Sequence, residues 1–185
     1  MSEYRIASRY AKSLLSLAVE NGKLEEVHSD MQLLSQLAAE NRDFELMLKS
    51  PVVLHQKKLA ILNKVFTGKV DAMSLSIFQL LTKKHREEYL PLIAQEFHHM
   101  YNDHMGIAEA TVTTTYVLDK KSKEAFEDVV KSITKKKVEL TEVVDESLIG
   151  GFVLKVGDRQ IDDSVSSRLK ALRVEFSRNH YQKAF

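Results

Sequence analysis

Apolar residues recur three and four positions apart through the first 105 residues, the spacing that places them on one face of an α-helix. This pattern predicts six helices, at 4–21, 24–40, about 44–48, 56–66, 71–83 and 87–104. Turn-forming residues separate several of them, among them Asn21-Gly22, Ser50-Pro51 and Thr67-Gly68. Because the connections are short, the sequence predicts an all-α six-helix bundle over residues 1–105.

The periodicity changes after Gly106. Residues 107–118 alternate and are rich in β-branched side chains, 122–135 return to helical spacing, and 138–144 are again extended. Gly157-Asp158 stands between two further strand-like runs and is typical of a hairpin turn. A last helix follows, with apolar positions at Val165, Leu169, Leu172 and Phe176. The sequence therefore predicts an α+β protein, in which residues 106–185 form a small C-terminal α/β domain with a short sheet and a final helix.

The first and fifth predicted helices carry more apolar residues than a single core-facing stripe requires. On the first helix, Ala7 and Leu14 mark the stripe, and a second apolar set lies to one side of it: Ile6, Tyr10 and Leu17. On the fifth, the predicted core face holds Met73, Ile77, Leu80 and Leu81. Two apolar residues of that helix point elsewhere, Leu75 and Phe78. Two explanations remain open: a groove that holds a partner's amphipathic helix, or helices that are buried on two sides.

The stretch 143–172 has paired glycines beside several carboxylates, an arrangement that could suggest an acid/base active site. Gly150 and Gly151 are followed by a strand and lack the spacing of a phosphate-binding loop, so they predict a bent strand or a close backbone approach. Asp145 is one of the carboxylates of this stretch. Asp162 and Ser164 are expected to cap the final helix, either together or with only one of them accepting backbone N–H groups. No His, Ser or Lys is placed to complete a reaction centre, so no catalytic residue is expected.

Composition and charge exclude several classes of protein. The 185 residues include 27 basic and 26 acidic side chains, divided evenly between the two predicted domains, so charge does not indicate a nucleic-acid binder. There is no cysteine, which excludes disulfides and thiolate metal sites. His98, His99 and His104 do not share a helical face, and no cofactor motif is present, so neither a metal nor a cofactor is expected. No apolar stretch approaches the roughly 20 residues of a membrane span, so direct membrane insertion is not expected.

The motifs resemble those of a known family, the delta subunits of F-type ATP synthase, whose mitochondrial counterpart is the oligomycin sensitivity-conferring protein. The strongest part is Val144-Asp145, then 148–152, Gly157-Asp158, and Asp162-x-Ser164-Val165 with Leu169. Further positions fall where the family has similar residues: Arg9-Tyr10-Ala11, Pro51 followed by Lys58, and Arg86 at the start of the sixth helix. The resemblance covers nearly the whole chain. It departs at Glu146, where the family often has Pro, and at Lys84-His85, where Asn-Lys or Asn-Gly is common.

The resemblance implies a non-catalytic stator subunit in the peripheral stalk of a proton-translocating rotary ATP synthase. One copy would lie at the cytoplasmic face of a bacterial plasma membrane, within a hetero-oligomeric complex. Its helical domain would hold N-terminal helices of the alpha subunits, and its C-terminal domain would hold the distal ends of the b subunits. A free-standing helical adaptor or regulatory binding protein is the alternative, and an acid/base enzyme ranks third.

Candidate partner-binding residues follow from combining this resemblance with the apolar surplus. The groove for an alpha-subunit helix is expected to be lined by Ile6, Tyr10, Leu17, Leu75 and Phe78. On the final helix, we expect the sheet to be covered by Leu169, Leu172 and Phe176. The candidates for the b-subunit contact are then the outward apolar residues of the C-terminal segment: Val174, Tyr181 and Phe185.

Overall fold

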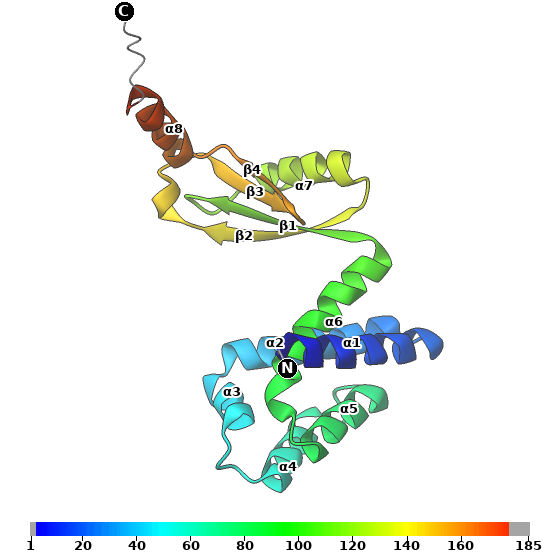
Figure 1. Cartoon of the computed structure of the whole chain (residues 1–185). Helices are drawn as coiled ribbons and strands as arrows, with labels where there is room; N and C mark the ends of the chain where they lie inside the picture. Colours follow the sequence, from blue (N-terminus) through cyan, green and yellow to red (C-terminus); the bar gives the residue numbers. More distant parts are fainter. Residues whose placement is uncertain (1–2, 178–185) are drawn as a thin grey trace, which may run out of the picture. The chain divides into compact units, whose positions relative to one another are not determined.

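A computed structural model describes residues 3–177 and divides them into two units, with the division between His104 and Met105 (Figure 1). The first unit is helical. Its elements are α1 (Glu3–Glu20), α2 (Leu24–Glu40), α3 (Arg42–Lys49), α4 (His55–Phe66), α5 (Ala72–Lys83), the 3-10 helix η1 (Glu87–Tyr89) and α6 (Leu90–Met105). Together with a sheet-containing second unit, this confirms the predicted α+β fold class.

Local chemistry explains where the helices of the first unit begin and end. Gly22 has a φ of 65°, and the backbone N–H of Lys23 returns to the carbonyl of Ala18 at 2.9 Å, which ends α1 with a left-handed glycine turn. Asn41 begins α3, because its side-chain oxygen accepts the N–H of Phe44 at 3.1 Å. Asp71 begins α5 in the same way, accepting the N–H of Met73 at 2.9 Å.

The core of the helical unit contains an aromatic cluster. The ring centroids of Phe66 and Phe78 lie 5.1 Å apart, and those of Phe44 and Phe66 lie 6.4 Å apart. The core-facing side of α5 therefore differs from the predicted one and holds Ser74, Phe78, Leu81 and Thr82. Thr82 can be buried because its hydroxyl donates to the carbonyl of Phe78 at 2.8 Å. Leu80, which the sequence assigned to the core, is 44% exposed.

The second unit contains a four-stranded sheet. Its elements are β1 (Ile107–Thr114), α7 (Lys120–Thr134), β2 (Lys137–Val144), the 3-10 helix η2 (Glu146–Leu148), β3 (Phe152–Val156), β4 (Arg159–Asp162) and α8 (Val165–Ser177). The strand order is β2-β1-β3-β4, with β1 and β2 parallel and the other pairs antiparallel. A parallel pair needs a crossover, which α7 supplies between β1 and β2. The core lies between α7 and the sheet and contains Ala110, Val112, Leu118, Val130 and Leu154.

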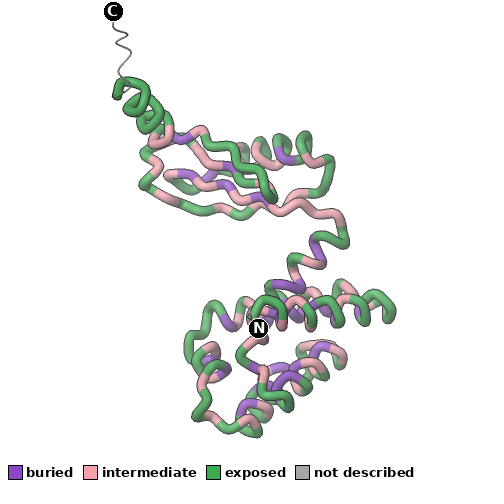
Figure 2. The backbone as a smooth tube through the Cα atoms, in the orientation of Figure 1, coloured by how far each residue is buried: buried purple, intermediate pink, exposed green. Residues whose placement is uncertain are grey.

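The last helix, α8, does not cover the sheet. It contacts η2 instead, and none of its residues is buried (Figures 1 and 2). The expectation that Leu169, Leu172 and Phe176 face the sheet is therefore wrong, since these side chains are 46% to 85% exposed. Helical spacing identifies an apolar stripe, but it does not identify what covers that stripe.

Candidate partner-binding surfaces

The predicted surplus on α1 lies beside the core stripe. Ala7, Ala11, Leu14 and Ala18 are buried, which fixes the face that α1 turns to its neighbours. Ile6 and Tyr10 are half-buried on one flank of that face, and Leu17 on the same flank is exposed. This flank faces the turn between α5 and η1, because the Tyr10 hydroxyl accepts a hydrogen bond from Nη1 of Arg86 at 2.9 Å. The Arg86 guanidinium carbon also lies 5.9 Å from the centroid of the Tyr10 ring.

The residues predicted on α5 do not lie on that side. Phe78 is 0% exposed and packs on Phe66, so it is a core residue and cannot line an open groove. Leu75 lies one turn before Gln79 on the same side of α5, and Gln79 Nε2 donates to Asn63 Oδ1 of α4 at 3.0 Å. Leu75 is thus half-buried on the α4 side.

The flank of α5 away from α4 carries other apolar residues. Ile77 is half-buried there and Leu80 is exposed. The sequence placed both in the core, because α5 is apolar almost all the way round and its pattern does not fix which side faces inward. We define the α1–α5 surface as the apolar flanks that these two helices leave partly exposed, formed by Ile6, Tyr10, Leu17, Ile77 and Leu80.

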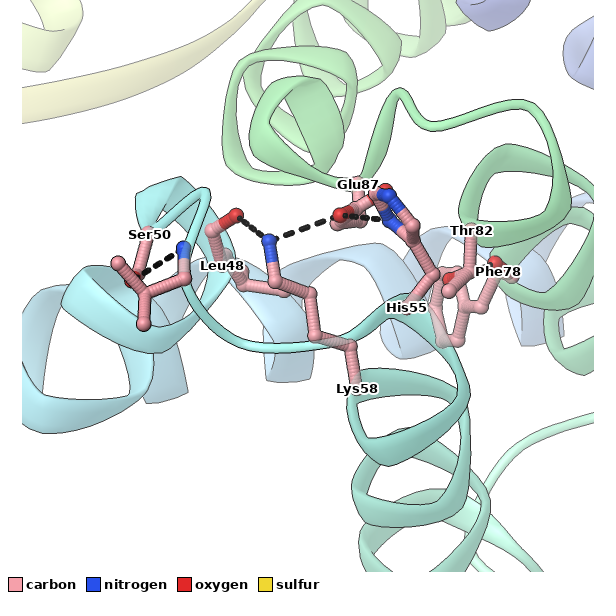
Figure 3. Close-up of polar contacts among 8 residues, drawn as sticks. Leu48, Ser50, His55, Lys58, Phe78, Thr82 and Glu87 are labelled. Atoms are coloured by element: carbon pink, nitrogen blue, oxygen red, sulfur yellow. Dashed lines mark hydrogen bonds and ion pairs between the residues drawn. The ribbon is translucent and has the colours of Figure 1, made fainter.

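A buried ion pair supports the segment that carries Arg86 (Figure 3). Lys58 Nζ donates to Glu87 Oε1 at 2.8 Å and to the carbonyl of Leu48 at 2.8 Å, and His55 Nδ1 lies 2.9 Å from the same carboxylate oxygen. Both side chains of the ion pair are almost fully buried. Burial alone would raise the pKa of the Glu87 carboxyl. Hydrogen bonds from Lys58, from the backbone and from His55 outweigh burial and hold this pKa below its ordinary value.

This network joins the end of α3, the first turn of α4 and η1. It fixes Glu87, and with it the preceding residue Arg86, whose side chain reaches Tyr10 on α1. Sequence reasoning did not identify the network, although a signal was present. Lys58 stands four residues before Leu62 and eight before Phe66, in register with the buried face of α4. A lysine at such a position requires a buried partner.

The glycine motif of the second unit holds the start of α8 against η2. Gly151 has a φ of 78°, and a Cβ atom there would collide with the carbonyl oxygen of Asp163. The carbonyl of Gly150 accepts the N–H of Val165 at 3.0 Å. Asp145 begins η2 by accepting the N–H of Ser147 at 2.9 Å. Its pKa is held below the ordinary value by the hydrogen bonds from the Ser147 side chain and backbone.

Ser164 and Asp162 have different roles at the start of α8. The buried Ser164 hydroxyl oxygen accepts the N–H of Ser167 at 3.2 Å, which makes Ser164 the capping residue. Asp162 accepts the N–H of Ser164 at 3.0 Å and the hydroxyl of Ser167 at 2.7 Å. Those bonds, first the one from the Ser167 side chain, hold the pKa of Asp162 below its ordinary value. Asp162 therefore shapes the turn before the helix.

Four apolar residues of α8 form an uncovered stripe. Their spacing of four, three and four residues places Val165, Leu169, Leu172 and Phe176 on one side of the helix, which we name the α8 stripe. Val174, the outward candidate from the sequence, is exposed on the opposite side. The other two candidates, Tyr181 and Phe185, lie outside the described residues.

No metal site is evident in residues 3–177. They contain no group of three or more His, Asp or Glu side chains that could hold a metal ion. His98 Nδ1 instead lies 2.9 Å from Nε2 of His28. None of the helices in this range combines the length and apolar character that a membrane crossing requires.

Comparisons with known proteins agree on one family. The family model described as ATP synthase delta (OSCP) subunit matches residues 6–176. ATP synthase subunit delta of Cytophaga hutchinsonii is 43% identical over 177 residues, covering 96% of this chain and 97% of the relative. The subunit of the same name from Christiangramia forsetii is 37% identical over 177 residues, covering 96% of each chain.

A solved structure shares the fold. A chain of the Toxoplasma gondii mitochondrial ATP synthase hexamer superposes with a TM-score of 0.77 at 22% identity, covering 92% of this chain and 96% of that one. At that identity the likeness concerns the fold, whereas the bacterial relatives and the family model establish the family. The chain therefore belongs to the ATP synthase delta (OSCP) subunit family and is a structural subunit of an F-type ATP synthase, without an active site of its own.

Proposed function

We propose that this stator subunit joins two partners: the N-terminal helices of the alpha subunits, on the α1–α5 surface, and the distal helical ends of the b subunits, on the α8 stripe. One copy would lie at the cytoplasmic face of a bacterial plasma membrane and hold the catalytic head against the torque of the rotor. The observation that carries the proposal is that each of the two units has apolar surface that its own fold leaves uncovered.

The α1–α5 surface suits an amphipathic helix. Such a helix is recognised by a groove that accepts apolar anchors at one face, spaced three and four residues apart. Ile6, Tyr10 and Leu17 share one flank of α1, and the hydrogen bond between Arg86 and Tyr10 ties that flank to the end of α5. Leu17 and Leu80 are 48% and 44% exposed, so covering both would contribute roughly as much as fully burying one leucine, about 1.5–3 kcal/mol.

The α8 stripe suits a second helix. Apolar residues spaced four, three and four apart form the seam along which two helices pack with their side chains interlocked. Phe176 is 85% exposed near the end of this seam. A large exposed aromatic side chain is typical of a binding anchor, because its burial dominates interface energetics.

A pair of matched variants tests the first contact. Leu80→Asp is expected to abolish binding of a synthetic peptide with the alpha subunit's N-terminal sequence, measured by calorimetry, and to leave the far-UV circular dichroism spectrum unchanged. Leu33→Asp, at an exposed leucine of α2, is the control and should bind normally. Wild-type affinity in the Leu80 variant would exclude the α1–α5 surface as the alpha-subunit site.

The second contact has its own test. Leu169→Asp should prevent capture of the water-soluble part of the b subunit, whereas Val129→Asp, at an exposed valine of α7, should not. Equal capture by the two variants would remove α8 from the proposal and leave the α1–α5 contact standing.

A further inference from the structure

Ile149 adopts a backbone conformation that an isoleucine rarely takes. Its φ is 67° and its ψ is −33°, immediately after η2. Positive φ is disfavoured for L-residues because Cβ crowds the backbone, and β-branched side chains suffer most. Two other non-glycine residues in the described part have positive φ, His85 and Lys135. Neither of them is β-branched, and Lys135 sits at the left-handed end of α7, where such a conformation is common.

The Ile149 side chain contributes little packing to the second unit. It is 67% exposed, so its packing does not offset the backbone strain. The next two positions are Gly150 and Gly151, and Gly151 has a φ of 78°. The chain thus uses glycine at the position of positive φ two residues further on, yet keeps a large apolar residue at 149. Strained backbone conformations persist where the surrounding structure fixes them, and they cluster at functional sites.

Ile149 lies next to the beginning of the α8 stripe. The carbonyl of Gly150 accepts the N–H of Val165 at 3.0 Å, and a Cβ atom at Gly150 would lie 3.2 Å from Cγ2 of Val165. The turn that carries Ile149 is fixed on its other side by Asp145 and Ser147. In Figure 1 this turn is the yellow segment beside the start of α8. The backbone turn that carries Ile149 is therefore joined to the first residue of the α8 stripe.

We propose that Ile149 and the α8 stripe form one continuous docking surface, and that Ile149 anchors the end of a b-subunit helix lying along α8. This inference rests on the proposed function and adds a specific residue to it. The occupant is an amphipathic helix, because the 4-3-4 spacing of the stripe matches the seam between two helices. Arg173 stands beside the stripe, four residues after Leu169 and three before Phe176, where it can pair with a carboxylate at the edge of the partner helix. The hydrogen bonds between Asp145 and Ser147 and between Gly150 and Val165 hold the turn in place before the partner arrives, which reduces the ordering required on binding.

Two substitutions at this position separate a binding role from a structural one. Ile149→Asn and Ile149→Gly both favour positive φ, so the melting temperature of the full chain should stay the same or rise. Affinity for the water-soluble part of the b subunit should fall at least tenfold, which corresponds to about 1.4 kcal/mol. Val52→Asn removes an exposed β-branched side chain from the first unit and should leave this affinity unchanged.

Each outcome of the experiment decides something. Unchanged affinity in both Ile149 variants would overturn the inference, and so would a clear fall in melting temperature, which would assign Ile149 to the fold. Leu169→Asp in the same assay distinguishes failure of the α8 contact from failure of the Ile149 anchor. If it abolishes binding while the Ile149 variants bind normally, the α8 contact stands and the Ile149 anchor fails. If none of the variants weakens binding, the α8 contact fails as well.

Discussion

Arg86 donates from Nη1 to the hydroxyl of Tyr10 at 2.9 Å, and its guanidinium lies over the Tyr10 ring. The two residues are far apart in the sequence, and their contact joins α1 to the segment between α5 and α6. The same contact sets the flank of α1 that carries Ile6 and Leu17 beside the end of α5. One hydrogen bond thus helps define the surface on which we expect the alpha subunit to bind.

Tyr10→Phe is expected to cost about 0.5–1.5 kcal/mol of unfolding free energy, because it removes the hydroxyl acceptor and keeps the ring beneath the guanidinium. Urea denaturation of the full chain measures this loss. Tyr4→Phe is the matched control on the same helix, where the side chain is exposed, and it should lie within about 0.5 kcal/mol of the parent. Equal effects at the two tyrosines would contradict a specific role for the contact.

Lys58→Met should cost about 3–5 kcal/mol, because it leaves the buried Glu87 carboxylate without its main partner. Lys57→Met changes the exposed neighbouring lysine and should have little effect. Combining Lys58→Met with Glu87→Leu removes both charges, and the double variant should recover most of the lost stability. A double variant as unstable as the sum of the two single ones would show that the residues do not act as a pair.

The Lys58–Glu87 pair also shows where the sequence was informative and where it was not. Helical period predicted the six helices of the first unit, and alternation with turn signals predicted the strands and the hairpin of the second. These signals are local, so a single sequence contains them. The partner of Lys58 is in another helix, 29 residues further along the chain, and no periodicity records that distance.

The site residues were harder to predict for two physical reasons. Helix α5 is apolar on most of its circumference, so small hydroxyl residues such as Ser74 and Thr82 could occupy its core face while Leu80 faced outward. Helix α8 has a regular apolar stripe, and the sequence pattern of such a stripe is the same whether a sheet or a partner covers it. On α1 the small alanines mark the core side, and Tyr10 and Leu17 lie beside it as the sequence predicted, while their contact with the alpha subunit stays a prediction.

Acid should weaken the helical unit through Glu87. Its pKa in the folded chain lies below the ordinary value of 4.5, so as the pH falls the unfolded chain takes up the proton first. The stabilisation is therefore fully present above about pH 5 and is lost as the pH falls through the folded-state pKa. The urea midpoint should drop over this range, and Glu87→Gln should flatten that part of the profile. An identical profile in the variant would assign the acid sensitivity to other carboxylates.

Gly151→Ala should destabilise the second unit by about 3 kcal/mol or more, because a Cβ there meets the backbone carbonyl of Asp163 in addition to the unfavourable φ. Gly157→Ala is the control, with a φ of 55° and open space around the added atom. It should cost only about 1–2 kcal/mol, the conformational term alone. Thermal unfolding followed by amide resonances of the second unit gives both values. Similar losses at the two glycines would mean that the close approach of the backbone is unimportant.

Ser164→Ala should cost about 1 kcal/mol through loss of the α8 cap. The effect should appear mainly as reduced helicity, because α8 has 13 residues, none of them buried, and an isolated helix of that length is marginal in water. Far-UV circular dichroism measures this loss of helicity between about 5 and 40 °C, roughly the range over which short helices fray. Ser132→Ala on α7 removes a serine that is not a cap and serves as the control.

A frayed α8 must be ordered again when it binds, so the Ser164→Ala variant should also bind the b subunit more weakly, by a factor of about 5 for 1 kcal/mol. Full helicity combined with weakened binding would instead place Ser164 in direct contact with the partner, which its complete burial in this structure argues against.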